Sequence, residues 1–130
     1  DLDTLGIDYV EGGWPGANPT DDTFFSDPPK LRHTKLTAFG MTRRSGRSTE
    51  NDPGLKTLID SRTPAVCIVG KTWDFQVEVA LGIELDENTN MIRGIATIRK
   101  IVKAFGILNC TIIPSENIHR YSLLASEKYL

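Results

Sequence analysis

The sequence predicts an α/β fold with a parallel β-sheet, because strand-like and helix-like segments alternate along the chain. Apolar, β-branched runs recur four times, and helix signals follow the runs. Such alternation implies parallel strands joined by right-handed crossovers. The pattern leaves two closures open, an open doubly wound sheet and part of an eight-stranded barrel.

Four short apolar runs mark the expected strands. The run at residues 65–69 is apolar throughout, which is typical of a strand buried on both faces. The expected strands cover residues 7–11, 35–41, 65–70 and 110–114. Cys67 and Cys110 lie within two of these runs, so we expect buried thiols and no disulfide.

Capping signals predict two short helices. Thr20 is the expected N-cap of a helix over residues 20–26, which has acidic residues in its first turn and a Pro-Pro pair shortly after its end. Asp52 followed by Pro53 is a second start signal, because proline suits the first helical position. The leucine spacing after Pro53 indicates one apolar face.

The strongest helical pattern covers residues 86–105. Acidic residues lie at its start and basic residues near its end, and both favour the helix macrodipole. Gly106 occupies the position of a C-terminal cap. A weaker helix is expected over residues 122–130. Apolar side chains recur in the long helix at spacings of four and three, which predicts a face turned to the core: Met91, Ile95, Ile98, Val102 and Phe105.

Composition and charge narrow the class of protein. The 130 residues are 39% hydrophobic and 25% charged, which suits one soluble globular domain or a piece of one. The formal net charge of -2 gives no attraction to nucleic acid. No apolar run reaches the roughly 20 residues of a membrane span, and the first residues lack a signal-peptide pattern. We therefore expect a cytoplasmic protein that binds neither nucleic acid nor membrane.

Charged and aromatic side chains follow every expected strand. Ligands bind at the carboxyl ends of strands in both closures, so the loops after the strands are the expected site. The residues in question are Glu11 and Trp14 after the first strand, Arg43 and Arg44 after the second, Lys71 and Asp74 after the third, and Glu116 after the fourth.

Three long segments resemble a known enzyme family. They read "LGIDYVEGGWPGANPTDDTFF", "KLTAFGMTRR" and "TPAVCIVGKTWDFQVEVALGIELDEN". Their sequence and order resemble the citramalate-forming branch of the isopropylmalate and homocitrate synthase family, over about residues 2–101. The resemblance implies that residues 1–130 are part of a (β/α)8 TIM barrel, roughly its second to fifth βα units, with a divergent stretch at 107–130.

The resemblance also implies an activity. Members of the family join acetyl-CoA to a 2-oxo acid in a Claisen-type condensation and hydrolyse the thioester; in this branch, which serves isoleucine biosynthesis, the oxo acid is pyruvate. A divalent metal, magnesium or manganese, polarises the ketone. Glu11 and Glu116 are then the expected catalytic carboxylates, although Glu11 also fits a solvated acid at a strand end. The glycines beside Glu11 would let backbone approach the ligand, and Trp14 offers either an apolar wall or a packing contact.

Three cationic residues are expected to bind substrate on the same resemblance. Arg43 and Arg44 suit a carboxylate or a CoA phosphate, because guanidinium groups bind planar anions in a bidentate manner. A solvated basic loop is the alternative. Lys71 suits a developing negative charge, with Asp74 beside it in the same motif. A structural ion pair between Lys71 and Asp74 is the alternative.

The departures from the family pattern concern the metal. The family's Asp ligand on the first strand and its His-x-His pair on a later strand have no counterparts in this sequence. Glu116 aligns with a family glutamate, but Pro114 and Asn117 replace the neighbouring aspartate and histidine. Three hypotheses follow: a portion of a working acyltransferase, a truncated non-catalytic relic that binds partners, and an unrelated open α/β binding protein. Open sheet edges favour a homo-oligomer in the second case.

Overall fold

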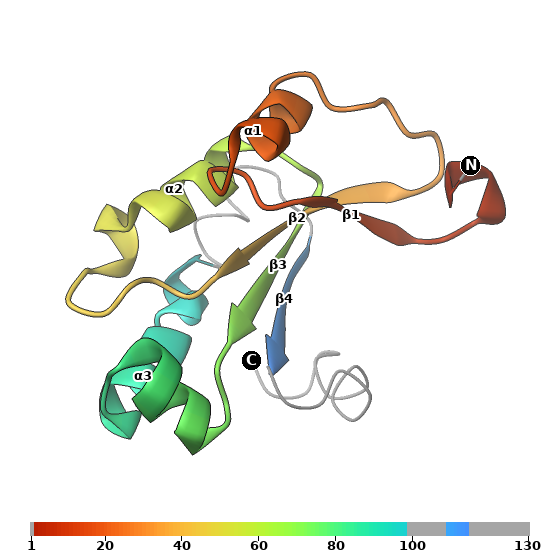
Figure 1. Cartoon of the computed structure of the whole chain (residues 1–130). Coiled ribbons are helices and arrows are strands. Elements are labelled where there is room, and N and C mark those ends of the chain that lie inside the picture. Colours follow the sequence, from red (N-terminus) through yellow and green to blue (C-terminus); the bar gives the residue numbers. More distant parts are fainter. Residues whose placement is uncertain (1, 99–108, 115–130) are drawn as a thin grey trace.

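The computed structural model describes residues 2–98 and 109–114 and shows a four-stranded parallel sheet with helices on one face (Figure 1). The strands are β1 (Tyr9–Gly13), β2 (Lys35–Met41), β3 (Ala65–Gly70) and β4 (Asn109–Pro114). They lie in the order β1-β2-β3-β4, and each neighbouring pair is parallel. The predicted α/β class, strand positions and sequential order are confirmed, with β1 beginning two residues late. Closure into a barrel stays a prediction, as does the assignment of 107–130 as divergent.

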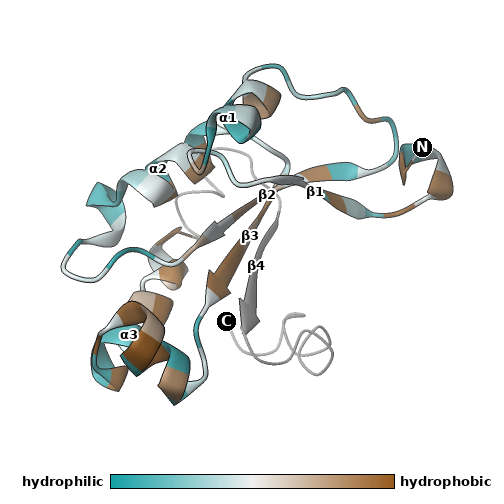
Figure 2. Ribbon diagram, viewed as in Figure 1, coloured by the Kyte–Doolittle hydropathy of each residue, from teal (hydrophilic) through white to brown (hydrophobic). Residues whose placement is uncertain are grey.

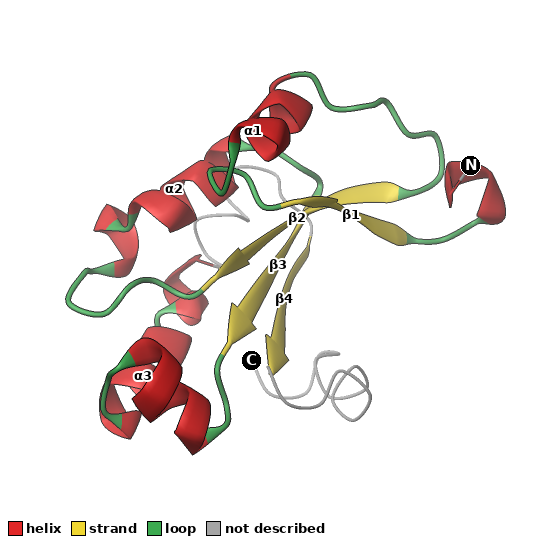
Figure 3. Cartoon of the chain, in the orientation of Figure 1, coloured by secondary structure: helices red, strands yellow, loops and turns green. Residues whose placement is uncertain are grey.

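The register places one row of side chains on the face that the helices cover. Val10 pairs with Leu36, Ala38 with Val66, and Gly40 with Ile68. Alternation along each strand puts the intervening residues on the other face. Figure 3 shows α1, α2 and α3 on one side of the strands, so the sheet has a helix-covered face and a second face without a described α-helix.

Helix α1 (Pro19–Ser26) begins one residue before the predicted start. Asn18 is its N-cap, because the Asn18 side chain accepts a hydrogen bond of 2.9 Å from the backbone N–H of Asp21. Thr20 was expected to cap the helix, and that expectation is wrong. Pro19 takes the first helical position, where its fixed φ and missing donor are tolerated, and this sets the cap at the residue before it.

Helix α2 (Pro53–Asp60) confirms the predicted start and follows a short 3₁₀ turn, η2 (Thr49–Asn51). Asp52 is the N-cap, and its Oδ1 accepts a 3.0 Å hydrogen bond from the N–H of Leu55. Leu55 and Leu58, one turn apart, are both buried. They turn the apolar stripe of the helix onto the sheet.

The predicted long helix is interrupted within the described residues. Helix α3 covers Leu85–Arg93, and Gly94 is its C-cap. Residues 95–98 form a further helical turn. Glycine has a low helix propensity, which accounts for a break that the apolar periodicity did not reveal. A π-helix, η3 (Gln76–Leu81), precedes α3 and was not predicted; it ends at Gly82, whose φ is 63°. The rest of the predicted long helix with its cap, residues 99–106, and the predicted helix over residues 122–130 lie outside the described residues.

The core lies between the sheet and the helices. Met91, Ile95 and Ile98 are buried as predicted, and the Cys67 side chain is also buried. Figure 2 shows hydrophobic colouring along β3, the strand at the centre of this layer. Seven buried residues form one cluster: Ala38, Leu55, Leu58, Val66, Ile68, Ile95 and Ile98.

Two glycines permit close packing on the helix-covered face. A Cβ on Gly12 would lie 2.4 Å from Cε1 of Phe24 in α1, and a Cβ on Gly40 would lie 3.0 Å from Cδ2 of Leu58 in α2. Gly12 was expected to admit a ligand. The structure shows instead that it admits the ring of Phe24.

The N-terminal turn η1 (Leu2–Leu5) is fastened by one carboxylate. Asp3 accepts hydrogen bonds from three successive backbone N–H groups, those of Arg32, His33 and Thr34, at 2.8 to 2.9 Å. These donors hold the pKa of the Asp3 carboxyl well below its usual range. The start of the chain is thereby tied to the segment that leads into β2. Across residues 2–98 and 109–114, no helix is long and apolar enough to cross a bilayer.

Candidate functional site at the carboxyl ends of the strands

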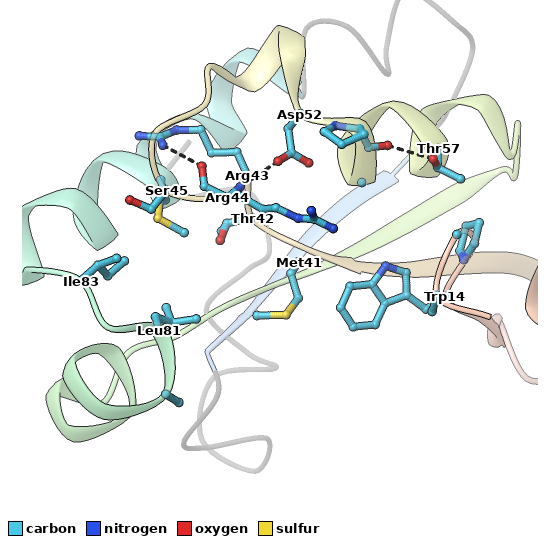
Figure 4. A pocket seen from close by; sticks show the side chains of 17 residues that line it. Trp14, Met41, Thr42, Arg43, Arg44, Ser45, Asp52, Thr57, Leu81 and Ile83 are labelled. Atoms are coloured by element: carbon cyan, nitrogen blue, oxygen red, sulfur yellow. Dashed lines mark hydrogen bonds between the residues drawn. The ribbon is translucent and has the colours of Figure 1, made fainter.

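A pocket of about 670 Å³ opens where β1 and β2 end (Figure 4). Its walls come from consecutive βα loops, from the start of α2 and from η3. This is the end of a parallel sheet at which α/β proteins bind ligands. The lining comprises residues 14–17, 41–45, 52–54 and 57, together with Ala80, Leu81, Ile83 and Met91.

Trp14 forms one wall, and its loop is held by the helix that follows. The indole packs edge-on against Phe39, with ring centroids 5.7 Å apart. The backbone N–H of Trp14 donates to Oδ2 of Asp21 at 3.1 Å, and the backbone N–H of Gly16 donates to Oδ1 of Asp22 at 2.7 Å. The acidic first turn of α1 therefore fixes the loop that carries Trp14.

The guanidinium of Arg43, at the wall of the pocket, contacts α3. Its Nη1 lies 2.7 Å from Oε1 of Glu87, and its Nη2 lies 3.3 Å from Oε2. Nη1 also donates to the carbonyl oxygen of Arg44 at 3.2 Å. The hydrogen bond to Glu87 raises the pKa of the Arg43 guanidinium, and the same contact lowers the pKa of the Glu87 carboxyl. Arg43 lines the pocket but is bound to a protein carboxylate.

Arg44 has the opposite arrangement. Its backbone N–H donates to Oδ2 of Asp52 at 2.8 Å, so the main chain is fixed. Its side chain is exposed and extends across the pocket towards Trp14 in Figure 4. Within residues 2–98 and 109–114, no ion pair or hydrogen bond holds the Arg44 guanidinium.

Asp52 joins this loop to α2. The residue is only 2% exposed, and its two oxygens accept the N–H groups of Leu55 and Arg44. A buried carboxylate of this kind is stabilised by its donors. Sequence reasoning found Asp52 as a helix cap but missed its contact with the loop.

Lys71 and Asp74 lie at a second pocket, of about 570 Å³, between the loop after β3 and α3. The two side chains form no ion pair within the described part of the chain, so that alternative is wrong. Asp74 instead accepts the N–H of Phe75 at 2.7 Å. The carbonyl of Lys71 accepts a hydrogen bond of 2.9 Å from Nδ2 of Asn88.

Glu11 and Glu116 do not join these residues in the described structure. Glu11 is exposed, pairs in register with Thr37, and lies on the face of the sheet opposite the helices. It lines neither pocket. Glu116 lies outside the described residues. The structure thus brings Trp14, Arg43 and Arg44 to one pocket and places Lys71 and Asp74 at another; the roles of all seven stay predictions.

The described residues do not fit a divalent metal centre. Residues 2–98 and 109–114 contain no group of three or more His, Cys, Asp or Glu side chains arranged to hold an ion. Magnesium and manganese prefer several oxygen ligands at fixed positions. Glu11 belongs to no such group, so no chemical step through a metal follows from this part of the chain.

Glu87 is the residue of this region that sequence reasoning did not single out. It was seen only as an acidic residue in the first turn of a helix, a position that suits the macrodipole. Its partner lies 44 residues earlier in the sequence. No local pattern joins the two, so only the fold reveals the contact.

The fold and the pocket define a parallel α/β segment with a ligand-sized site at its strand ends. Over 93 residues, 70% of this chain, the sequence is 50% identical to (R)-citramalate synthase of Aquifex aeolicus and 50% identical to that of Geobacter sulfurreducens. It is 44% identical over 94 residues to the (R)-citramalate synthase of Streptomyces coelicolor. The matched part of the chain is a citramalate synthase-like segment.

The match covers a small part of each relative. The chain spans 18% of the length of these three curated proteins. No family model matches the chain, and no solved structure matches it.

Proposed function

We propose that this chain forms part of the catalytic domain of a citramalate synthase-like acyltransferase, which condenses acetyl-CoA with pyruvate and releases free CoA. The observation that carries the proposal is the 670 Å³ pocket, to which all three resembling segments contribute, with residues 14–17, residues 41–44, and Ala80, Leu81 and Ile83. Its position at the strand ends is where a barrel enzyme binds substrate. The names of the relatives support a citramalate-forming reaction, and the two substrates follow from the family resemblance.

The described residues contribute binding surfaces to this reaction. Trp14 and Met41 offer apolar contact, and Arg44 offers a positive charge. The carbon–carbon bond forms between the acetyl methyl carbon, after loss of a proton, and the ketone carbon of pyruvate, whose oxygen takes up a proton. Water then hydrolyses the thioester and releases CoA. Polarising that ketone is the task of a divalent metal in such chemistry, and the described residues do not supply its ligands. We therefore assign the condensation to an assembly larger than residues 2–98.

A chimeric enzyme tests the proposal. The segment of the Aquifex aeolicus (R)-citramalate synthase that aligns with residues 8–98 would be replaced by residues 8–98 of this chain. We expect condensation of acetyl-CoA with pyruvate, followed by release of free thiol. A folded chimera that forms no product would contradict the proposal. A second chimera carrying Trp14→Ala and Arg44→Gln is the matched control and should lose most of the activity.

The isolated chain is expected to be inactive. Purified chain mixed with manganese, acetyl-CoA and pyruvate should release no thiol above a heat-denatured control, because no complete metal site is present in its described part. Turnover by the isolated chain would contradict this expectation. An inactive chain together with an inactive chimera would favour the alternative, a non-catalytic relic of such an enzyme.

A further inference from the structure

We propose that Arg44 is the anion-binding side chain of the 670 Å³ pocket and that Arg43 is a positioning residue held by Glu87. The ligand is an elongated molecule with uncharged polar and apolar groups along its length and one terminal anionic group. Its size and chemistry match the phosphopantetheine arm of an acyl thioester and not a three-carbon oxo acid. The choice of thioester rests on the proposed function, whereas the division of roles between the arginines rests on the geometry alone.

The guanidinium of Arg43 already has hydrogen-bond acceptors within the protein. It makes two hydrogen bonds to Glu87 and one to the carbonyl of Arg44. Its side chain is only 12% exposed in this ion pair. A ligand that used Arg43 would first have to break a bidentate charge-assisted contact, the strong form of such pairs. The cost makes Arg43 a poor anion receptor.

Arg44 is prepared for the task by its neighbours. Asp52 accepts its N–H, and Arg43 donates to its carbonyl oxygen, so both backbone polar groups are held. The side chain is left to extend over the pocket (Figure 4). Asp52 does not compete for the guanidinium, because its two oxygens already accept backbone N–H groups. Fixing the main chain reduces the entropy lost when an anion binds.

The remaining walls select the rest of the ligand. Trp14, Met41, Leu81 and Ile83 present apolar surface around the guanidinium. Pockets of about 300 to 1,000 Å³ hold ligands of drug size, and this one lies in that range. Pyruvate has six non-hydrogen atoms and would leave most of the volume to water. An extended arm with a terminal phosphate uses both the apolar walls and the single free charge.

A fluorescence titration of the full chain tests the proposal. Trp14 lines the pocket and Trp73 does not, so the Trp73→Phe background leaves Trp14 as the reporter. The probes are 4′-phosphopantetheine, pantetheine and pyruvate. We expect the phosphorylated arm to bind about tenfold or more tightly than pantetheine, the gain typical of a hydrogen bond to a charged group. Pyruvate should leave the emission unchanged.

Three substitutions in this background separate the two arginines. Arg44→Gln should bring the two Kd values within about twofold of each other, since the charged contact is lost. Arg44→Lys should keep part of the preference, because lysine keeps the positive charge but cannot make the bidentate hydrogen bonds of a guanidinium. Glu87→Gln should keep the preference, since it removes Arg43's partner and adds positive potential. Circular dichroism of each variant checks that the fold is retained.

Several results would overturn the inference. They are retention of the phosphate preference in Arg44→Gln, its loss in Glu87→Gln, equal binding of both arms by the parent chain, or no binding of either. These outcomes are independent of the chimera. A clear preference with an inactive chimera would leave the anion site standing and remove the proposed function, and the reverse result would do the opposite.

Discussion

Arg43 and Glu87 form a two-pronged ion pair between the loop after β2 and the first turn of α3, with contacts of 2.7 and 3.3 Å. Their side chains are 12% and 30% exposed. Glu87 is further stabilised by the Gly46 N–H and by Ser45 of the same loop. The pair therefore joins two successive βα units on the side of the sheet where the pocket opens.

Replacing Glu87 with Gln should lower the melting temperature at neutral pH. Because Arg43 lowers the pKa of the Glu87 carboxyl, its contribution is present above the ordinary carboxyl pKa and is lost as pH falls through the lowered value. The gap in melting temperature between the parent and Glu87→Gln should therefore be full at pH 7 and shrink below the ordinary pKa of 4.5. Calorimetry across this pH range measures it.

The matched control for this prediction is the exposed ion pair between Lys56 and Asp60, one turn apart in α2. Exposed pairs of this kind contribute about 0.3 to 0.5 kcal/mol, so Asp60→Asn should shift the melting temperature much less. Equal shifts in melting temperature from the two variants at neutral pH would show that the Arg43–Glu87 pair stabilises the fold no more than an exposed ion pair does.

Asp3→Asn should release the N-terminal turn. The wild-type carboxylate accepts three backbone N–H groups, and an amide offers one oxygen with no charge. Amide hydrogen exchange at Arg32, His33 and Thr34 should be slow in the parent at neutral pH and faster in the variant. Since these donors lower the Asp3 pKa, the protection should persist below the ordinary pKa of an aspartate and fail only in stronger acid.

Asp27 supplies the control for that experiment, because its side chain accepts no hydrogen bond from a described residue. Asp27→Asn should leave exchange at the three amides unchanged. Exchange that is equally slow in Asp3→Asn and the parent would refute the role given to Asp3.

Asp52→Ala should destabilise the fold by about 2 kcal/mol, since it removes a helix N-cap and leaves a second N–H without its acceptor. Both contacts are short, 3.0 Å from Leu55 and 2.8 Å from Arg44. Urea unfolding followed by circular dichroism measures the change. Asp52→Asn keeps a capping oxygen and should cost less. An alanine variant as stable as the asparagine variant would contradict the double role.

Gly12→Ala should cost about 1 to 3 kcal/mol through overpacking. The added Cβ would lie 2.4 Å from Phe24 and 2.9 Å from Leu36. Phe24→Leu removes the ring that causes the closest contact, so the double variant should be more stable than the sum of the two single changes implies. Strict additivity in urea unfolding would show that the ring is not what excludes a side chain at Gly12.

Local sequence signals were sufficient where one signal dominated. The strands follow from apolar β-branched runs, and Asp52 followed by Pro53 set the start of α2. The start of α1 was misjudged because Asn18 and Thr20 are both competent caps and Pro19 decides between them. The break at Gly94 was missed because apolar spacing continues across it.

The candidate site was less predictable than the fold. Position after a strand correctly brought Trp14, Arg43 and Arg44 to one pocket. Nothing in "TRR" distinguishes the two arginines, because the distinction depends on Glu87, which belongs to the next βα unit. Chemistry that depends on contacts between distant segments is not encoded in a local motif.

The sequential strand order bears on how the chain folds while it is being synthesised. Tyr9 meets Lys35, Thr37 meets Ala65, and Ala65 meets Asn109, so each strand docks on the one made just before it. No pairing between described strands waits for a distant C-terminal partner. Successive βα units can therefore assemble in the order in which they are synthesised. If each new strand is added beside the previous one, the most recently synthesised strand forms an edge of the sheet at every stage of translation.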